Sequence, residues 1–473
     1  MTETQKFEEL KHTRRPLSGA GQVVVVDTGA LIGAEEIAML QALHSRSLGG
    51  IDSHLLKLAQ KGAKNFMETY YVGYGDKSIG DCGTATIFIE GVSMLVAKAV
   101  QDTQLYNGQE ASTRYIDFAR QPFANPHGSE EGVVFLERLR AFHLRGLGIM
   151  KSALAERHPR LPDEDEKVWQ KAINARSFDV MRSFLPAGAA TNLAWHTTLR
   201  HAADHLLRLR HHPLQEVRDV AQAVQEALGE MYPSSFKQKL YPATEQYVEE
   251  WMKNYYFLDE DYRYPGVEMV RDGIDRRLLA THRKELETRP AKAEPPKYLA
   301  ECGTAQFRFL LDFGSFRDLQ RQRAIIQRMP LLTDNRGFEQ WYLDQMPPLF
   351  ATEAVEFLRE YRDGLIKAGI KPNVMHTGEY SLQRLVNLQY YIPMGYRVTC
   401  RITGDLPAHI WWVELRSGIN VHPTLRKVAR ESGEFILESY GGDGLVLHLD
   451  NTPDRFNYKR GTQDIVEKVL TVS

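Results

Sequence analysis

Three polar side chains stand at alternate positions in the segment 107–115. Glu110, Ser112 and Arg114 occupy positions i, i+2 and i+4, which places them on the same side of an extended or loop segment. An arginine fork and a hydroxyl together suit a phosphate group, because both donate hydrogen bonds to its oxygens. The pattern therefore predicts an anion-binding loop. The alternative is an ion-paired loop in which Glu110 bridges Arg114.

A second group of cationic side chains stands near residue 320. Arg321 and Arg323, with Arg317 and Arg328 close by, form a local basic cluster. Such a cluster suits an anionic ligand, and the alternative is that the arginines satisfy the last carbonyl groups of a helix. Aromatic residues do not alternate with these basic residues as they do in nucleic-acid modules. A nucleic-acid partner is therefore not expected.

The amino-acid composition is that of an ordinary globular protein. Lys and Arg number 59 against 61 for Asp and Glu, a net charge of −2, which argues against a broad basic face. The three cysteines, Cys82, Cys302 and Cys400, have no CxxC spacing, so neither a disulfide framework nor a metal site is expected. The polar N-terminus and the short aliphatic runs predict neither a secretory signal nor a membrane span. A cytoplasmic protein is the resulting expectation.

Hydrophobic patterning predicts the elements that must position these residues. Strands are expected at 22–26, 84–89, 307–311 and 445–449, helices at 29–43 and 195–210, and a flexible surface loop at 284–297. The turn between residue 26 and the helix that follows lacks both GxGxxG and GxxxxGK[ST] spacing. An ordinary turn is favoured there over a nucleotide-binding loop.

The sequence repeats itself in several places. Four features recur in the same order: Asp81-Cys-Gly-Thr-Ala as Glu301-Cys-Gly-Thr-Ala, Phe184-Leu-Pro186 as Tyr391-Ile-Pro393, Leu209-Arg210 as Leu415-Arg416, and Arg218 as Arg426. Four ordered matches indicate duplication. We expect a first repeat at 1–245, including a polar N-terminal arm, and a second, more divergent repeat at 246–473.

Taken in order, these motifs resemble those of the flavin-dependent thymidylate synthases. The segment 74–82 is followed by Glu110-Ala-Ser-Thr-Arg-Tyr115, then by Arg182-Ser-Phe-Leu-Pro186 and by the 209–218 segment. In the second repeat Arg321-Gln-Arg323 is similar to the Arg-His-Arg triplet of that family. The resemblance implies an α+β fold in two tandem copies, each with helices packed on a small antiparallel sheet.

The resemblance also implies a chemistry. Such enzymes use FAD, reduced by NADPH, to move a methylene group from methylenetetrahydrofolate to dUMP and reduce it to a methyl group. Arg210 would sit at the uracil as the catalytic cation. The implied substrate-binding residues are Glu110, Ser112, Arg114, Arg182, Arg210 and Arg321, and the implied cofactor-binding residues are Ser78, Asp81, His205, Arg321 and Arg323.

The two repeats keep complementary parts of the family motifs. The first repeat has Asp102-Thr-Gln104 in place of the arginine triplet, and the second has Gln389 in place of Arg182. One composite site between the repeats is therefore expected, in a homodimer that forms a pseudo-tetramer. Asp76, His201 and His205 depart from the family pattern. Two alternatives stay open for this reason: a flavoenzyme acting on another pyrimidine nucleotide, and a non-catalytic nucleotide-binding paralogue.

Overall fold

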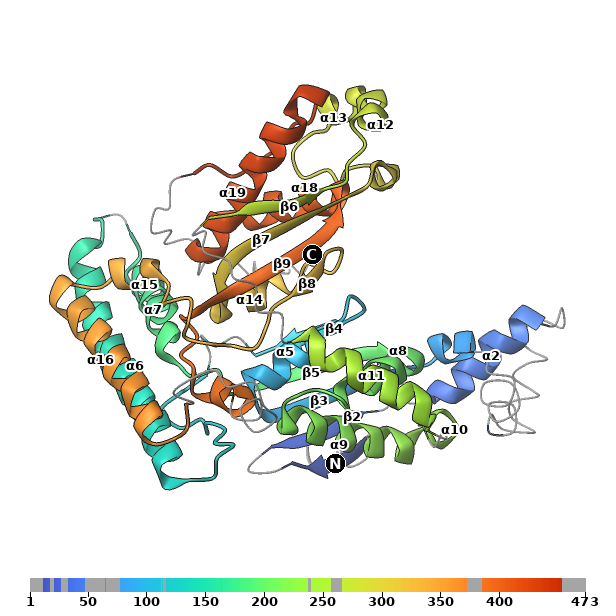
Figure 1. The fold of residues 1–473 in the computed structure, drawn as a ribbon, viewed down its shortest axis with the longest axis horizontal. Coiled ribbons are helices and arrows are strands. Elements are labelled where there is room, and N and C mark those ends of the chain that lie inside the picture. The colour runs from blue at the N-terminus through green and yellow to red at the C-terminus, as the bar shows by residue number, and fades with distance from the viewer. Residues whose placement is uncertain are drawn as a thin grey trace, which may run out of the picture. The chain divides into compact units, whose positions relative to one another are not determined.

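The computed structural model describes residues 12–17, 21–26, 33–46, 64, 77–111, 113, 116–162, 164–236, 240–256, 266–371 and 385–452. The predicted site residues Ser112 and Arg114 lie outside these ranges. The chain divides into two compact units (Figure 1). Unit 1 comprises 1–116, 121–124 and 188–257, and unit 2 comprises 117–120, 125–187 and 258–473.

Unit 1 contains a five-stranded antiparallel sheet with the order β1-β2-β3-β5-β4. Its strands are β1 (His12–Pro16), β2 (Gln22–Val26), β3 (Thr84–Ser93), β4 (Asn107–Glu110) and β5 (Ala190–Thr198). Its helices are α2 (Ala34–Arg46), the 3-10 helix η2 (Lys77–Cys82), α5 (Met94–Gln101), α8 (Leu199–Leu209), α9 (Gln215–Met231), α10 (Pro233–Phe236) and α11 (Pro242–Tyr255). Helix α9 packs along β1 and β2.

The helix predicted at 195–210 begins four residues later than expected. Trp195 is buried, His196 exposed and Thr197 buried, the alternation of a strand with one covered face. Thr198 then ends β5 and caps α8, since its hydroxyl accepts a hydrogen bond from the backbone N–H of His201. The apolar residues at 195 and 197 therefore belong to the sheet, and the helical pattern starts at Leu199.

Unit 2 contains a four-stranded antiparallel sheet with the order β6-β7-β9-β8. The strands are β6 (Glu268–Asp272), β7 (Thr304–Asp312), β8 (Ile326–Arg328) and β9 (Arg397–Asp405). The helices that flank them in sequence are α12 (Arg276–Thr281), α13 (Arg283–Thr288), η5 (Lys297–Cys302), α14 (Phe313–Leu319), α18 (Leu406–Arg416) and α19 (Pro423–Tyr440).

Helices from both sequence repeats share one core in unit 2. Helices α6 (Glu130–Arg157) and α7 (Glu166–Met181) pack with α15 (Gln340–Asp344) and α16 (Pro348–Lys367). Phe142 stacks on Phe350 and on Phe357, with ring centroids 5.4 and 4.2 Å apart. The segment 125–187 thus lies with the second repeat. The boundary at 245/246 stays a prediction about the duplicated sequence, because the compact units follow a different division.

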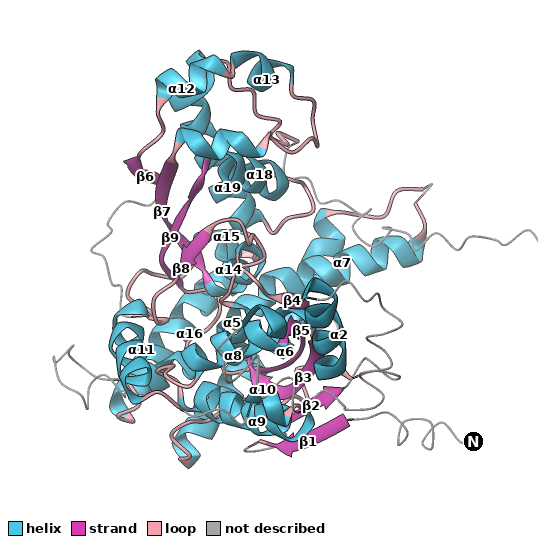
Figure 2. Ribbon diagram, turned by 90° about the vertical axis from the view of Figure 1, so that its right-hand side faces the viewer, coloured by secondary structure: helices cyan, strands magenta, loops and turns pink. Residues whose placement is uncertain are grey.

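Four strands of the first sheet, β2-β3-β5-β4, follow the same order as β6-β7-β9-β8 of the second, and β1 is additional; both sheets are labelled in Figure 2. In each, a 3-10 helix leads into a central strand, a helix and an edge strand, η2-β3-α5-β4 and η5-β7-α14-β8. A second central strand then leads into two helices, β5-α8-α9 and β9-α18-α19. The predicted α+β class with small antiparallel sheets is confirmed, and the arrangement is consistent with two copies.

Two other local predictions were wrong. Residues 445–449 form no strand, because the segment is held by the side chains of Arg289 and Glu414 rather than by a strand partner. The expected loop 284–297 begins inside helix α13, and Arg289 within it is buried. Among the described residues no helix is long and apolar enough to cross a membrane.

Candidate functional site

Unit 1 has a pocket of about 390 Å³, its open mouth included. Its walls come from strand β5, helix α8 and the turn after α5: Thr103, Leu105, Trp195, Thr197, His201, Asp204, His205 and Arg208. The space enclosed by these walls is about 100 Å³, which is smaller than most small-molecule sites and would hold only part of a larger ligand. His205, predicted from the sequence to contact a cofactor, forms part of the wall.

The His205 ring presents one nitrogen as an acceptor. Its side chain is buried, and Nε2 lies 3.0 Å from the carbonyl oxygen of Val100. A carbonyl only accepts, so Nε2 carries the hydrogen. Burial lowers the pKa of His205 to about 3, which keeps the ring neutral near pH 7. Nδ1 has no hydrogen-bond partner among the described residues and is therefore a buried acceptor.

Trp195 places a buried donor beside that acceptor. Its ring lies edge-on to His205, with centroids 5.5 Å apart, and its Nε1 also has no partner within the described chain. A tryptophan and a histidine also pair in unit 2, at different positions and within one helix, where Trp412 Nε1 donates to His409 Nδ1 at 3.1 Å. Buried polar atoms normally have partners, so the open donor and acceptor of unit 1 point to a ligand.

Asp81 is held near this pocket by the side chains of Arg200 and His201. Arg200 Nη1 donates to Asp81 Oδ2 at 2.8 Å, and Nε2 of the pocket residue His201 lies 3.7 Å from Oδ1. Of the predicted cofactor residues, Asp81 and His205 are therefore both associated with the pocket. Ser78 belongs to η2, and its side chain lies outside what the structure describes.

Arg182, the predicted nucleotide contact, is buried in unit 2 on the 3-10 helix η4 (Arg182–Phe184). Burial disfavours its charge, but Tyr342, Asp179 and Asp312 raise its pKa, and the guanidinium stays cationic. Its Nε and Nη2 atoms have no hydrogen-bond partner among the described residues. The side chain thus keeps two donors for an acceptor that the described residues do not supply.

Asp318 brings Arg182 together with residues of the second repeat. Burial opposes the charge of Asp318, yet the field of Arg182, Arg321 and Arg416 holds its pKa below the ordinary value. Arg321 Nε lies 3.9 Å from Asp318 Oδ1. The guanidinium groups around Asp318 outnumber the carboxylates, even with Asp179 and Asp312 beside Arg182, and such an excess of positive charge favours an additional anion. Arg323 lies on the exposed turn that follows.

Two predicted substrate residues have partners within unit 1. Glu110 ends β4 and accepts a hydrogen bond from Gln101 Nε2 at 2.9 Å. Arg210, the predicted catalytic cation, follows α8 and donates from Nη2 to Glu245 Oε1 at 2.8 Å. Its charge is therefore engaged by a carboxylate of helix α11.

Sequence reasoning missed Trp195, Asp318 and Glu245. Asp318 stands three residues before Arg321, the spacing of neighbours on a helix surface, so its link to the basic cluster was available from the sequence. Trp195 belongs to none of the motifs recognised in the sequence. Glu245 is far from Arg210 in the chain, and no pattern connects the two.

The comparisons with known proteins agree with the motif analysis. Residues 33–234 match the sequence model of a family described as thymidylate synthase complementing protein. A UPF0159 protein of Chlamydia muridarum is 23% identical, covering 81% of this chain and 80% of its own. Another, of Chlamydia pneumoniae, is 24% identical over 78% and 77% of the two chains, and one of Thermoplasma acidophilum is 23% identical over 78% and 85%.

These relatives match far more of the chain than the family segment does, so the match continues into the second repeat. Their names state no substrate or activity. The family match instead covers the pocket of unit 1 and the motif residues from Ser78 to Arg218. The chain therefore carries, in residues 33–234, a domain of the thymidylate synthase complementing protein family, which confirms the resemblance to the flavin-dependent thymidylate synthases.

Proposed function

We propose that this chain methylates dUMP to dTMP, with FAD as cofactor and with methylenetetrahydrofolate and NADPH as co-substrates. The observation that carries the proposal is the buried pair of Trp195 Nε1 and His205 Nδ1 in the pocket of unit 1. The polar edge of a flavin ring alternates carbonyl oxygens with a ring N–H. A neighbouring donor and acceptor are complementary to such an edge.

The residues of the pocket fit this cofactor in chemical type. Trp195 would donate to a ring carbonyl, and neutral His205 would accept from the ring N–H. Asp81 would hold His201 and Arg200 in place at the side of the pocket. The bound flavin would supply the redox chemistry, and the protein its orientation and electrostatics.

The arginines around Asp318 support an anionic substrate. Arg182 has two nitrogens without hydrogen-bond partners among the described residues, and Arg321 is exposed. Guanidinium groups suit phosphate because they donate two parallel hydrogen bonds. The resemblance assigns the dUMP phosphate to Ser112 and Arg114, with Glu110 and Arg182 as further nucleotide contacts and Arg323 near the flavin. We propose Arg321 as an additional phosphate contact. Arg182 and Arg321 come from different sequence repeats, as a composite site requires.

A visible absorption spectrum of the full chain tests the proposal. We expect added FAD to give a bound-flavin spectrum, and dUMP to perturb it in a saturable way. FAD that remains spectrally free at all protein concentrations would contradict the assignment. A methyl-transfer assay with labelled methylenetetrahydrofolate then separates dUMP from other pyrimidine nucleotides. We also propose a homodimer, which sedimentation tests directly: a monomeric mass contradicts it.

One observation favours a second candidate, a nucleotide-binding protein without catalysis. Arg210 would have to face the pyrimidine during methylation, yet it is engaged by Glu245. If this ion pair persists with ligand bound, the cation cannot stabilise negative charge on the ring. Nucleotide binding without bound flavin and without methyl transfer would favour this candidate.

A further inference from the structure

The contact between helices α8 and α11 has the composition of a small anion site. One oxygen of Glu245 accepts from Arg210 Nη2 at 2.8 Å, and the other lies 2.7 Å from His211 Nε2. A carboxylate only accepts, so this histidine nitrogen carries a hydrogen. Arg210 and His211 thus offer two donors to one carboxylate, the geometry that a phosphate or a small carboxylate would also require.

These side chains are within reach of solvent. The exposed fractions are 21% for Arg210, 16% for His211 and 21% for Glu245. Exchange of one anion for another at this place would therefore not open the core. A partly exposed ion pair of this kind is also weak, because water and salt screen it.

Helix α11 is held at its other end. Val248, Met252 and Tyr256 are buried, whereas Tyr241 and Tyr247 are 68% and 71% exposed. Tyr256 donates to Asp102 at 3.0 Å. The first turn of the helix, which carries Glu245, can therefore move while the second half keeps its packing.

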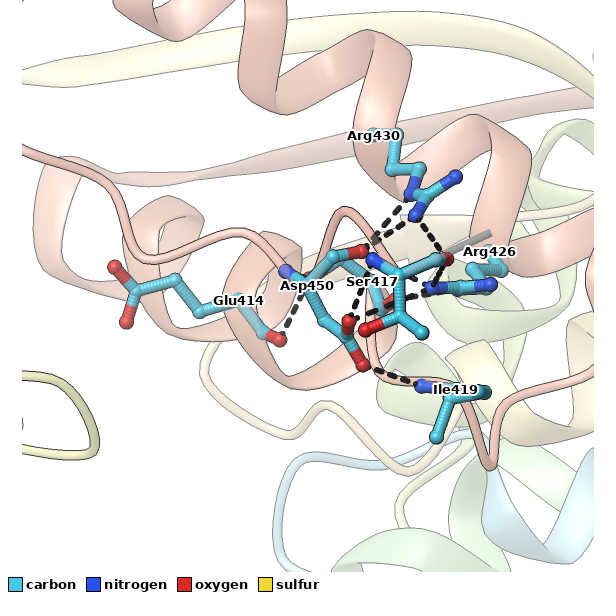
Figure 3. Close-up of polar contacts among 7 residues, drawn as sticks. Glu414, Ser417, Ile419, Arg426, Arg430 and Asp450 are labelled. Carbon is cyan, nitrogen blue, oxygen red and sulfur yellow. Dashed lines mark hydrogen bonds and ion pairs between the residues drawn. The ribbon is translucent and has the colours of Figure 1, made fainter. Parts of the chain in front are cut away.

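Unit 2 closes the equivalent helix end in a different way (Figure 3). Ser417 caps α18 where Arg210 caps α8, and it accepts a hydrogen bond from the backbone N–H of Asp450 at 3.0 Å. Arg426 and Arg430 donate to the backbone carbonyl groups of Asp450 and Thr452. Ile419 N–H donates to the Asp450 carboxylate at 2.8 Å.

The helix end is closed in a fixed way in unit 2 and in an exchangeable way in unit 1. The closure of unit 2 combines the Asp450 carboxylate with several main-chain groups of residues 450 and 452, and a small ligand does not reproduce the main-chain part. The closure of unit 1 depends on a side-chain carboxylate over two donor side chains, which a free anion reproduces fully. Only the second arrangement lets a ligand compete for the site.

We propose that Glu245 is an internal occupant of an anion site formed by Arg210 and His211, and that a ligand phosphate or carboxylate displaces it and releases the first turn of α11. The inference rests on the proposed function only for the role of Arg210 as a cation that faces the nucleotide. An internal competitor lowers the apparent affinity by the fraction of time that it leaves the site free. Removal of its charge must then strengthen anion binding.

The test compares full-length wild type, E245Q and E249Q by calorimetric titration with inorganic phosphate, succinate and dUMP. Glu249 lies on the exposed face of the same helix near Lys253, so E249Q makes the same charge change away from the site. We expect E245Q to bind at least one of these anions on the order of tenfold tighter than wild type and E249Q. R210Q introduced into E245Q should abolish the gain. The preferred anion identifies the ligand as phosphate, carboxylate or nucleotide.

A second measurement does not depend on the variants folding well. In wild type, a saturating anion should speed amide hydrogen exchange in residues 243–248 and leave 250–256 unchanged. Equal affinities of wild type and E245Q, or unchanged exchange at saturation, would overturn the inference. Anion-driven release without FAD binding would retain it while the proposed function fails, and FAD binding with no anion effect at α11 would do the reverse.

Discussion

Asp312 occupies in the sheet of unit 2 the position that Ser93 occupies in unit 1. Each ends its strand and caps the next helix. Ser93 donates from Oγ to Glu216 at 2.6 Å, whereas Asp312 accepts from Thr424 Oγ1 at 2.7 Å. Donor and acceptor are thus exchanged between the repeats, and the exchange places a carboxylate on the strand end of unit 2, where it faces Arg182.

Arg182 and Asp312 should be strongly coupled in stability. Replacement of either alone removes a buried charge partner of the other, so R182Q and D312S should each lower the free energy of unfolding by about 3 kcal/mol. Gln389 and Ser93 are the residues at the corresponding positions of the other repeat. The double variant should therefore lose less than the sum of the two, with a coupling of about 1–3 kcal/mol in urea unfolding.

Arg359 supplies the matched control, since it lies on the exposed face of helix α16. R359Q combined with D312S should show additive losses. Additivity of R182Q with D312S as well would mean that the two charges do not compensate each other.

The strands at 22–26, 84–89 and 307–311 could be predicted because their residues show strand periodicity or an apolar run, and the duplication could be predicted because four motifs recur in order. The boundary at Thr198 could not, because strand β5 continues directly into helix α8 without a turn residue. The compact units could not be predicted either. No local sequence pattern distinguishes a segment that packs against its own repeat from a segment that packs against the other repeat.

The candidate site was predictable to the extent that its chemistry is local. Arg321 stands in a recognisable motif, whereas His205 departs from the family pattern. Arg321 lies beside Asp318, and His205 Nδ1 has no hydrogen-bond partner among the described residues. The arrangement of Arg182 with Asp318 depends on two segments that meet only in the folded unit. The ion pair of Arg210 with Glu245 likewise joins two segments that are distant in the chain. It engages the charge of Arg210, which the sequence alone left available for the substrate.

Trp195 should contribute to flavin binding through its N–H group. W195F keeps most of the ring volume and removes the donor, which is expected to cost about 1–1.5 kcal/mol in a buried site, or roughly a tenfold increase in the Kd for FAD. Fluorescence quenching of FAD on binding measures this directly.

Trp412 is a control in unit 2, because it is a buried tryptophan whose N–H is already bonded to His409. W412F should lower the free energy of unfolding by about 1–1.5 kcal/mol, the contribution of the lost hydrogen bond, and leave the Kd for FAD unchanged. An equal effect of both variants on FAD binding would show that Trp195 acts through stability alone.

Arg321 should bind the substrate phosphate and not the main body of the cofactor. R321Q removes an exposed charge next to Asp318, so the fold should tolerate it. A charge-assisted hydrogen bond contributes about 1.5–3 kcal/mol, and dUMP binding should weaken by at least tenfold, with deoxyuridine affected much less. Calorimetry with both ligands measures the difference. An equal loss for dUMP and deoxyuridine would place Arg321 away from the phosphate.

His143 should make unit 2 sensitive to mild acid. Its ring is buried between Phe118 and Phe178 with Nδ1 2.9 Å from the carbonyl oxygen of Met181, and burial lowers its pKa to about 4. In the unfolded chain the pKa returns to about 6.5, so between pH 6.5 and pH 4 only the unfolded state takes up this proton. Stability should fall by up to about 1.4 kcal/mol per pH unit as pH decreases through that window, roughly 3 kcal/mol in total.

H143Q removes the titrating group and keeps an amide that can donate to Met181. His205 and His409 are also buried with lowered pKa values, so wild type and variant will both lose stability in acid. The informative quantity is the difference between their urea-unfolding free energies at pH 7.5, 6 and 5. That difference should shrink or reverse as pH falls, because wild type alone has the cost of keeping the His143 ring neutral. A constant difference across this range would mean that the His143 ring becomes protonated in the folded state as readily as in the unfolded chain.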